Sequence, residues 1–461
     1  MLDKIKPEVL QIYNTFEKAG FEIYFVGGCV RNLLLNKEVK DWDLTTNATP
    51  EEIQKVFPDS FYDNLFGTVG VKFEEINEDD EGNLSKNYVE ITTYRSESRY
   101  TDRRHPESVT WGKTINEDLT RRDFTVNAIA LRLTQGESQG FELIDPFNGQ
   151  EDLKNKLIKA VGNPQERFKE DGLRLMRAVR FTTQLGFAIE DKTKTAITED
   201  ALLIQEISGE RIRDELLKIL DTETPYDGIA LLDEVGILKY IFPELEEGKG
   251  VSQARPGRHH TEDVFTHNIL SLKFCASTDP IVRLATLLHD VGKPYVAAQD
   301  EEGHIIFYNH EVKGAILSKE ISDRLRLSKK QKEKIYTLIR WHMFTVDTAL
   351  TDSAIRRFIR RVGVENVADM MDLRIGDRLG GGTQVAESWR LKKFKERITE
   401  QLNPPFSINN LAIDGNDIMK ELELKPGPEV GKILKTLFDE VDEDLSKNTR
   451  EYLLGRIKEV Q

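Results

Sequence analysis

The sequence contains almost no cysteine and no long apolar run. Cys29 and Cys275 are its only cysteines, and they lie in stretches that we expect to belong to different domains. A disulfide is therefore not expected, and a reducing compartment fits this composition. No apolar run approaches the roughly 20 residues that a helix needs to span a bilayer, and residues 1–6 lack the apolar core of a secretory signal. We expect a cytoplasmic protein with no membrane partner.

Positive charge is also in deficit. The chain has 65 Lys and Arg residues against 80 Asp and Glu residues, which gives a formal net charge of −15. This balance argues against a protein that coats nucleic acid nonspecifically, although the average does not exclude a local basic surface. Basic residues cluster at 356–361 and 390–397. Such clusters are most often solvated helix faces, and they are also candidates for a surface that follows a nucleic-acid backbone.

The length and the hydrophobic periodicity indicate several domains. A globular chain of 461 residues is too long for one core, so roughly two to four domains are expected. Up to about residue 150, helical patterns such as residues 7–18 alternate with apolar segments typical of strands, which predicts an α/β domain. The strand-like segments are residues 21–26, 65–73, 88–94 and 141–146. From Leu153 onward we find helical periodicity and no convincing strands.

A glycine pair and an Asp-x-Asp pair stand close together near the N-terminus. Gly27 and Gly28 follow a strand-like run, and glycines at such a turn let backbone N–H groups approach a phosphate, beside the positive charge of Arg31. Asp41 and Asp43 are one residue apart, so on a strand both carboxylates point to the same face. Neighbouring carboxylates repel unless a cation lies between them, and Mg²⁺ commonly joins carboxylates to substrate phosphates. Taken alone these motifs are a turn and a solvated pair; together with the rest of the chain they indicate a metal-dependent nucleotide site.

Two further features of the N-terminal part suit such a site. Glu90 lies between Val89 and Ile91 on an expected strand, so its side chain faces away from theirs, and it is a candidate third carboxylate. The simpler alternative is an exposed strand glutamate. Residues 95–111 interleave basic and aromatic side chains, which suits phosphate and base contacts as well as it suits a solvated loop.

Charged residues recur at steps of three in an expected helix over residues 170–185. Asp171, Arg174, Arg177 and Arg180 would share one broad face of that helix. The alternative is a surface ladder of ion pairs. Because the residues between them are mostly apolar and predict a well-packed helix, we expect the polar stripe to face a cleft.

Histidines crowd into one part of the helical region. Six of the eight histidines lie between residues 259 and 310, and the pair His289-Asp290 ends an apolar run. A single histidine on a helix is usually structural, but neutral imidazoles and carboxylates together bind divalent metals well. The candidate ligands are His267, His289, Asp290 and Asp377, with His310 and His342 as candidates for a second metal position.

Together these motifs resemble the bacterial class II tRNA nucleotidyltransferase and poly(A) polymerase family. The matching segments lie between residue 20 and about residue 185, and they are residues 27–32, 41–43, 66–68, 121–128, 145–147 and 167–174. Asn32 departs from the family, which usually has Asp there. The histidine-rich part is similar to an HD phosphohydrolase domain, and the C-terminal segment is similar to the tail of bacterial enzymes that add CCA to tRNA.

The resemblance implies a fold and a division into domains. An α/β nucleotidyltransferase head, with a mixed sheet and flanking helices, would span residues 1–150. An all-α remainder would follow, with a neck over 151–245 that binds nucleotide and RNA, an HD body over 246–385, and a helical tail over 386–461 that binds tRNA.

The resemblance also implies roles for residues of the head. Asp41 and Asp43 would hold Mg²⁺, which activates an RNA 3′-hydroxyl and neutralises the leaving pyrophosphate. Gly28 and Arg31 would cradle the triphosphate of the incoming nucleotide, and Arg122 would contact the nucleotide as well.

Neck residues would select the base. Asp171 and Arg174 would read the Watson–Crick edge, because C and A both carry an exocyclic amino group beside a ring acceptor, whereas G and U present the opposite order. Arg177 and Arg180 would contact the triphosphate or support the base-reading pair. In the HD body, His267, His289, Asp290 and Asp377 would bind a divalent transition metal and confer a phosphohydrolase activity.

The leading hypothesis is an enzyme that adds CCA to the 3′ end of tRNA from CTP and ATP without a nucleic-acid template. A poly(A) polymerase, or a tRNA enzyme that adds only CC or only A, is the nearest alternative; residues 95–111 resemble the loop of full CCA-adding members and favour complete addition. A metal-dependent phosphohydrolase whose head only binds RNA is a further alternative, which the intact Asp41 and Asp43 pair argues against.

Overall fold

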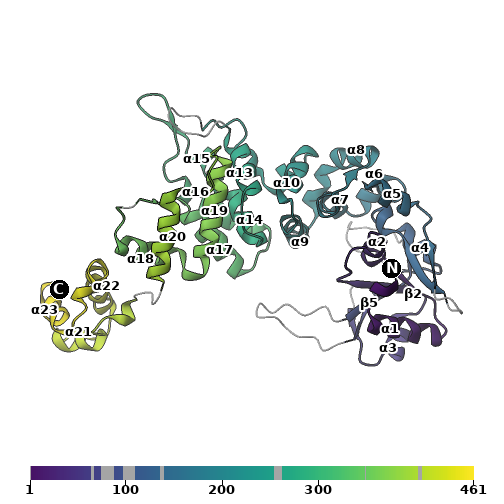
Figure 1. Ribbon diagram of the computed structural model, residues 1–461, viewed down its shortest axis with the longest axis horizontal. Helices are drawn as coiled ribbons and strands as arrows, with labels where there is room; N and C mark the ends of the chain where they lie inside the picture. The colour runs from purple at the N-terminus through teal and green to yellow at the C-terminus, as the bar shows by residue number, and fades with distance from the viewer. Residues whose placement is uncertain are drawn as a thin grey trace. The chain divides into compact units, whose positions relative to one another are not determined.

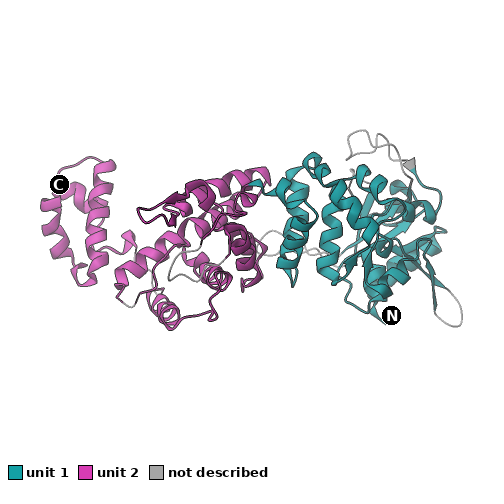
Figure 2. Ribbon diagram, turned by 90° about the horizontal axis from the view of Figure 1, so that it is seen from above, with its two compact units in different colours: residues 1–243 teal, residues 244–461 magenta. Residues whose placement is uncertain are grey.

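The computed structural model describes most of the chain. The described residues are 2–63, 67–73, 88–96, 110–134, 140–253, 262–347, 349–402 and 407–460. The chain divides into two compact units, residues 1–243 and 244–461 (Figure 2). Residues 97–109 lie outside the described residues, and they make up most of the basic and aromatic stretch that suits either nucleic-acid contacts or a solvated loop. The finer division into head, neck, body and tail stays a prediction.

A mixed sheet forms the centre of the first unit, as predicted (Figure 1). Its strand order is β3-β4-β5-β2-β1-β8-β9, and only the β2–β5 pair is parallel. The strands are β1 (Ile23–Val26), β2 (Trp42–Thr46), β3 (Phe61–Asp63), β4 (Thr68–Lys72), β5 (Tyr88–Thr93), β8 (Ala130–Thr134) and β9 (Gly140–Ile144). All four residues of β1 are buried, because the strand is central in the sheet and covered on both faces.

Helices cover the two faces of this sheet. On one face Tyr13 of α1 (Pro7–Lys18) stacks on Phe25 of β1 with ring centroids 5.2 Å apart. On the other face Tyr24 of β1 packs with Leu119 of α4 (Ile115–Thr120). Helix α1 has the predicted bounds. Helix α3 (Pro50–Val56) begins with the capping box that Thr49 and the acidic first turn of the helix favour.

The remainder of the first unit is mainly helical. Its longer helices are α5 (Gly149–Asn155), α6 (Pro164–Glu170), α7 (Leu173–Leu185), α8 (Asp191–Glu199), α9 (Gly209–Leu220) and α10 (Pro225–Glu234). The single helix predicted over residues 170–185 is wrong at its start. Asp171 has extended backbone dihedrals between α6 and α7, and its Oδ1 accepts a hydrogen bond from the backbone N–H of Leu173. Aspartate favours such local side-chain bonds over a continuous helix.

Short strands also occur where none were predicted. In the first unit β10 (Leu157–Ile158) pairs in parallel with β11 (Ala188–Ile189). In the second unit β12 (Ala298–Gln299) pairs with β13 (Ile305–Ile306). The expectation of no strands after Leu153 is therefore wrong, because a pairing of two residues is too short to leave a period-2 pattern in the sequence.

Helices form the core of the second unit. They are α13 (Val264–Lys273), α14 (Pro280–Leu288), α16 (His310–Arg324), α17 (Lys329–Trp341), α18 (Asp352–Val362), α19 (Val367–Gly380), α20 (Trp389–Gln401), α21 (Gly415–Glu421), α22 (Pro428–Glu443) and α23 (Arg450–Val460). Helix α13 packs against α14 and α19, and α16 packs against α17. None of the helices that the structure describes is both long and apolar enough to cross a membrane.

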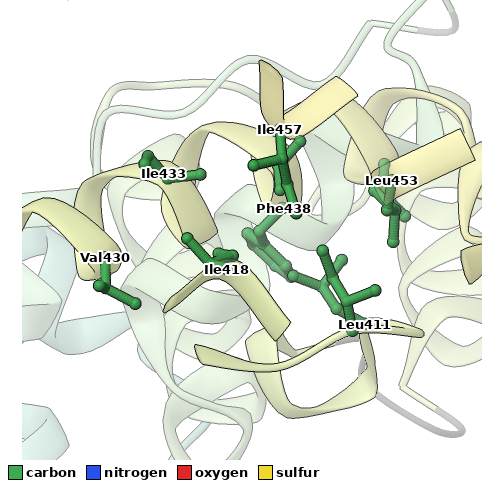
Figure 3. Close-up of a cluster of buried hydrophobic side chains, with 10 residues drawn as sticks. Leu411, Ile418, Val430, Ile433, Phe438, Leu453 and Ile457 are labelled. Carbon is green, nitrogen blue, oxygen red and sulfur yellow. The ribbon is translucent and has the colours of Figure 1, made fainter. Parts of the chain in front are cut away.

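The last three helices enclose a separate hydrophobic cluster. Figure 3 shows its side chains, which include Leu411, Ile418, Val430, Ile433, Phe438, Leu453 and Ile457. A buried ion cluster joins α22 to α18, because Asp442, only 1% exposed, lies 2.7 Å from Arg356 and 2.7 Å from Arg360. Two arginines of the basic cluster at 356–361 are thus structural partners of a buried carboxylate and not a solvated face.

Close packing of α13 on α19 leads to a stability prediction. A Cβ added at Gly376 would lie 2.6 Å from the backbone oxygen of Ser271, so Gly376→Ala forces the helices apart. We expect a loss of about 1–3 kcal/mol in the free energy of unfolding. Gly455→Ala is the matched control, because a Cβ at that helical position meets no described atom within 4 Å. Calorimetry that ranks the two variants equally would contradict this packing account.

Candidate nucleotide and metal sites

Three carboxylates lie together at one face of the head sheet. Asp43 of β2 is the register partner of Glu90 on the parallel strand β5, and Asp41 immediately precedes β2. Trp42, between the two aspartates, is 2% exposed and packs against Phe25 on the opposite face. All three carboxylates line one cavity of about 630 Å³. The alternation predicted from the sequence therefore brings Glu90 to the same cavity as the two aspartates.

Cations from several elements line the same cavity. Of the residues predicted to bind nucleotide, five line it: Gly28, Arg31, Arg122, Arg177 and Arg180. Further lining residues that the sequence analysis did not single out are Asp123, Asn127, Phe181, Gln184, Lys218, Asp221 and Thr222. Guanidinium groups and carboxylates that line one cavity suit a phosphate-bearing ligand with a divalent cation.

The turn before α2 (Gly28–Leu34) requires glycine. Gly27 has a φ of 70°, and a Cβ there would lie 2.9 Å from Nη1 of Arg122 and 3.7 Å from Oδ2 of Asp43. A side chain at this position would strain the backbone and displace a cation that lines the cavity. The turn at Gly27 thus brings the backbone close to Arg122 and Asp43, and the predicted approach of its N–H groups to a phosphate stays a prediction.

Arg31 is held by two amide side chains. It is 5% exposed, and it donates hydrogen bonds to Oδ1 of Asn127 at 2.7 Å and to Oδ1 of Asn32 at 3.0 and 3.2 Å. Burial, with the nearby Arg180, lowers the pKa of Arg31 to about 10. Asn32, the departure from the family pattern, keeps a hydrogen-bond acceptor for Arg31 but supplies no negative charge.

Arg177 is fixed by a buried carboxylate. It lies 2.7 Å from Asp123, which is 8% exposed. Burial alone would raise the pKa of Asp123, but Arg177 and Arg174 beside it and a hydrogen bond from Asn127 lower it to about 2. The carboxylate is therefore ionised at neutral pH, and it holds Arg177 at the cavity wall.

The two predicted base-reading residues are each held by another partner. Asp171 accepts two hydrogen bonds from Arg211, at 2.7 and 3.1 Å. Arg174 lies 2.5 Å from Glu170 and donates to the backbone oxygen of Arg121. Among the described residues that line the nucleotide cavity, neither Asp171 nor Arg174 is included. The structure therefore places them on one short segment, joined by a backbone hydrogen bond, with their side chains oriented separately.

Four predicted metal ligands converge in the second unit. The Nε2 atoms of His267 and His289 lie 3.2 Å apart, and Oδ2 of Asp290 lies 3.3 Å from each. Oδ1 of Asp377 lies 3.3 Å from the Nε2 of His267 and 3.7 Å from that of His289. His289 and Asp290 are adjacent in the chain, whereas His267 and Asp377 come from the separate helices α13 and α19, and the first three are at most 2% exposed. This is a compact set of nitrogen and oxygen donors.

A second set shares Asp290. Its other oxygen, Oδ1, lies 3.2 Å from Nε2 of His310 and 3.6 Å from Nε2 of His342, and these two nitrogen atoms are 3.3 Å apart. Each of the two groups, His267-His289-Asp290 and Asp290-His310-His342, has one donor atom per residue within 4.8 Å of the others. Asp290 is therefore placed to bridge two cations.

Backbone carbonyls orient three of these imidazoles. The Nδ1 atoms of His289, His310 and His342 each lie 2.7–2.8 Å from the carbonyl oxygen three residues earlier in the chain. A carbonyl oxygen only accepts, so each Nδ1 carries the proton and each Nε2 presents a lone pair to the cluster. Such second contacts are typical of metal-binding histidines.

Charge in this cluster also fits a cation. Burial would lower the pKa of His289, but Asp290 and Asp377 raise it to about 10. The pKa values of both carboxyl groups lie well below the usual range, although burial opposes this shift, because His289 and other cationic or donor groups surround them. With this raised pKa, the imidazole of His289 carries an extra proton at neutral pH. A divalent cation bound to the cluster would take the place of that proton.

Basic and aromatic residues border the cluster. A cavity of about 280 Å³ opens on Asp290, His310, His342 and Asp377, and it is also lined by Gln253, Lys293, Ile305, Ile306, Phe307, Tyr308, Met343 and Arg374. Nζ of Lys293 lies 2.5 Å from Oδ2 of Asp290. Two cations beside a set of metal ligands suit a phosphate ester as the ligand of this cavity.

Metal content tests this centre directly. We expect two divalent ions per wild-type chain after dialysis against Zn²⁺, Mn²⁺ or Co²⁺. The variant His342→Ala should bind one ion or none. The variant Asp290→Ala should bind none, because it lacks the carboxylate that both ligand sets share. His304→Ala is the matched control, since His304 pairs with Asp300 outside the cluster and its loss should leave both ions. Elemental analysis that finds no metal in the wild-type chain would refute the assignment.

Three comparisons connect the chain with known proteins. Family models match residues 23–159 as a poly(A) polymerase head domain, residues 186–249 as a probable RNA and SrmB-binding site of polymerase A, and residues 269–379 as an HD domain. The CCA-adding enzyme of Lactococcus lactis subsp. lactis (strain IL1403) is 32% identical over 466 residues, which cover 100% of this chain and 99% of that one.

Two other CCA-adding enzymes are also similar to nearly the whole chain. The CCA-adding enzyme of Limosilactobacillus reuteri (strain DSM 20016) is 33% identical over 452 residues, with 97% and 95% of the two chains covered. Among solved structures, the CCA-adding enzyme of Bacillus stearothermophilus in complex with CTP is 26% identical, with a TM-score of 0.65 and 99% and 98% of the two chains covered.

Proposed function

Because the chain belongs to the family of CCA-adding enzymes, we propose that it adds CCA to the 3′ end of tRNA from CTP and ATP, without a nucleic-acid template. The observation that carries this proposal is that Asp41, Asp43, Arg177 and Arg180 all line one cavity. The related enzyme from Bacillus stearothermophilus was solved with CTP, which supports a nucleotide as the ligand of this fold.

The carboxylates and the arginines have separate roles in the proposed reaction. Asp41 and Asp43, with Glu90 beside them, would hold Mg²⁺, which supplies charge stabilisation at the attacking and leaving oxygens. Gly28 and Arg31 bind the triphosphate, and Arg122, Arg177 and Arg180 neutralise it from the other elements. The 3′-oxygen of the RNA forms a bond to the α-phosphorus, the bond to the β-phosphate breaks, and pyrophosphate leaves.

Base selection is assigned to Asp171 and Arg174. Asp171 accepts from the amino group that C and A share, and Arg174 donates to the adjacent ring acceptor. Arg211 and Glu170 support this role, because each fixes one of the two side chains before the base arrives. A preoriented pair discriminates better than a mobile one.

A metal-dependent phosphohydrolase is the second proposed activity of the chain. The shared ligand Asp290 favours it, because a carboxylate between two cation positions suits the hydrolysis of phosphate esters. Lys293 and Arg374 are the residues that would bind the phosphate of such an ester. We propose a divalent transition metal at this centre, since histidine nitrogens outnumber carboxylates among the ligands.

The test is incubation with a tRNA that lacks its 3′ end, with each labelled nucleotide, followed by sizing of the product. Addition of the three nucleotides C, C and A supports the proposal. A long tract of A would identify a poly(A) polymerase. Addition of only CC, or of only A, would identify a partial tRNA enzyme. Removal of divalent cations with a chelator should stop addition in every case.

A variant of the metal site makes the test specific. Asp43→Asn removes one charge from the carboxylate pair, and several kcal/mol of transition-state stabilisation predict a loss of at least about a hundredfold in kcat/KM. Glu142→Gln, an exposed carboxylate on β9 of the same sheet, should retain wild-type activity. Near-normal addition by Asp43→Asn would remove the basis of the metal assignment.

A second variant tests base selection. Asp171→Ala removes the acceptor for the amino group of C or A, so kcat/KM for CTP and ATP should fall by about ten- to two-hundredfold, the worth of a charge-assisted hydrogen bond. UTP and GTP do not use this acceptor and should lose less, so discrimination narrows. Asp191→Ala, on exposed helix α8, is the control. If the ratios among the four nucleotides stay as in wild type, Asp171 does not read the base, even if overall activity falls.

A further inference from the structure

A buried carboxylate lies behind the arginines of the nucleotide cavity. Glu215 belongs to α9, which packs against α7, and its side chain is only 4% exposed. It is not among the described residues that line the cavity. Carboxylates this deeply buried are costly unless they are paired, so its partners identify its role.

All the partners of Glu215 point back to the cavity. Its Oε2 lies 2.5 Å from Nε of Arg180, and its Oε1 lies 3.8 Å from Nη1 of Arg177 and 3.7 Å from Nζ of Lys218. These three cations line the nucleotide cavity, whereas Glu215 does not. The carboxylate therefore contacts the cavity only through groups of opposite charge.

Arg180 and Arg177 need a counter-charge because, together with Arg31, they crowd one aromatic ring. The guanidinium carbons of Arg180, Arg177 and Arg31 lie 4.0, 5.3 and 5.2 Å from the centroid of Phe181. Cation–π contacts favour each arginine singly, but like charges at such short range repel. Burial and Arg177 lower the pKa of Arg180, and Glu215 opposes this change.

We propose that Glu215 is a positioning residue for the triphosphate: from α9 it fixes Arg180 in the orientation that meets the phosphates, and it places a second negative charge near Arg177, which Asp123 holds. Arg180 is fixed at a second point, since its Nη1 donates to Oε1 of Gln184 at 3.0 Å. Without Glu215, the long side chain of Arg180 would lose more rotamer freedom on binding, and that cost would appear as weaker affinity. This inference rests on the proposed nucleotide site.

The role predicts a defined pattern of effects. Triphosphates are common to CTP and ATP, so Glu215→Gln should weaken both nucleotides equally and leave their ratio unchanged. The dissociation constants of CTP, ATP and inorganic tripolyphosphate, measured by calorimetry with Mg²⁺, should rise by about five- to twentyfold, as expected for a charge-assisted contact. In the addition assay KM for both nucleotides should rise by the same factor, with kcat and KM for tRNA within twofold of wild type.

Two variants complete the design. Glu234→Gln, an exposed carboxylate of α10 that pairs with Lys194, is the matched control and should bind tripolyphosphate as wild type does. If Glu215→Gln does not fold, Glu215→Asp gives the same test, because it keeps the buried charge but withdraws the carboxylate from Arg180 by about 1.5 Å.

The binding test of Glu215 and the CCA-addition test of the proposed function can fail independently. Unchanged tripolyphosphate and nucleotide binding in a folded Glu215 variant overturns the inference, even if the melting temperature falls, because a purely structural role would lower stability alone. Failure of the wild-type chain to add CCA would refute the proposed function, and the binding measurement would still decide the role of Glu215.

Discussion

The candidate nucleotide cavity depends on the pairing of guanidinium groups, one buried and one half-buried, with buried acceptors. Arg177 is held by Asp123 and Arg180 by Glu215, and each acceptor comes from a different element than its arginine. A desolvated arginine without such a partner would be costly. Asp123 and Glu215 each occupy only part of the guanidinium group of their arginine, and both arginines also line the cavity. A protein with a net charge of −15 can therefore present a cationic wall to a polyanion, because local pairing outweighs the average charge.

In the candidate metal centre of the second unit, contacts with neighbouring groups likewise orient the side chains. Its imidazoles are oriented by backbone carbonyls, and Asp290 faces both sets of nitrogen atoms through its two oxygens. Close contact of α13 with α19, which Gly376 permits, brings His267 to Asp377. The two sites each lie within one compact unit, so each can be assembled by the packing of that unit alone.

Sequence patterns predicted the features of the fold and of the candidate sites that depend on short-range periodicity. Alternation along a strand predicted that Asp41 and Asp43 share one face and made Glu90 a candidate third carboxylate, and the pairing of β2 with β5 brings all three to one cavity. The candidate metal ligands were predicted from histidines and carboxylates of the helical region, and the structure brings these residues together. The mixed sheet was predicted from its resemblance to a known family.

Long-range partners were not predictable in this way. Asp123 and Glu215 lie 54 and 35 positions from the arginines they hold, and no local pattern connects them. The helix expected over residues 170–185 breaks at Asp171, because a local side-chain bond competes with helix formation. The departure of Asn32 from the family pattern was visible in the sequence, but only the structure showed that its side chain contacts Arg31.

The central claim is that the cavity between the carboxylates and the arginines of the first unit binds a nucleotide together with its metal. Crystals grown with Mn²⁺ and a CTP analogue whose α–β bridge cannot be cleaved test it most directly, since Mn²⁺ gives an anomalous signal. The account predicts an anomalous peak between Asp41 and Asp43 and phosphate density against Arg177 and Arg180. Nucleotide density elsewhere, with no Mn²⁺ at the two aspartates, would contradict it.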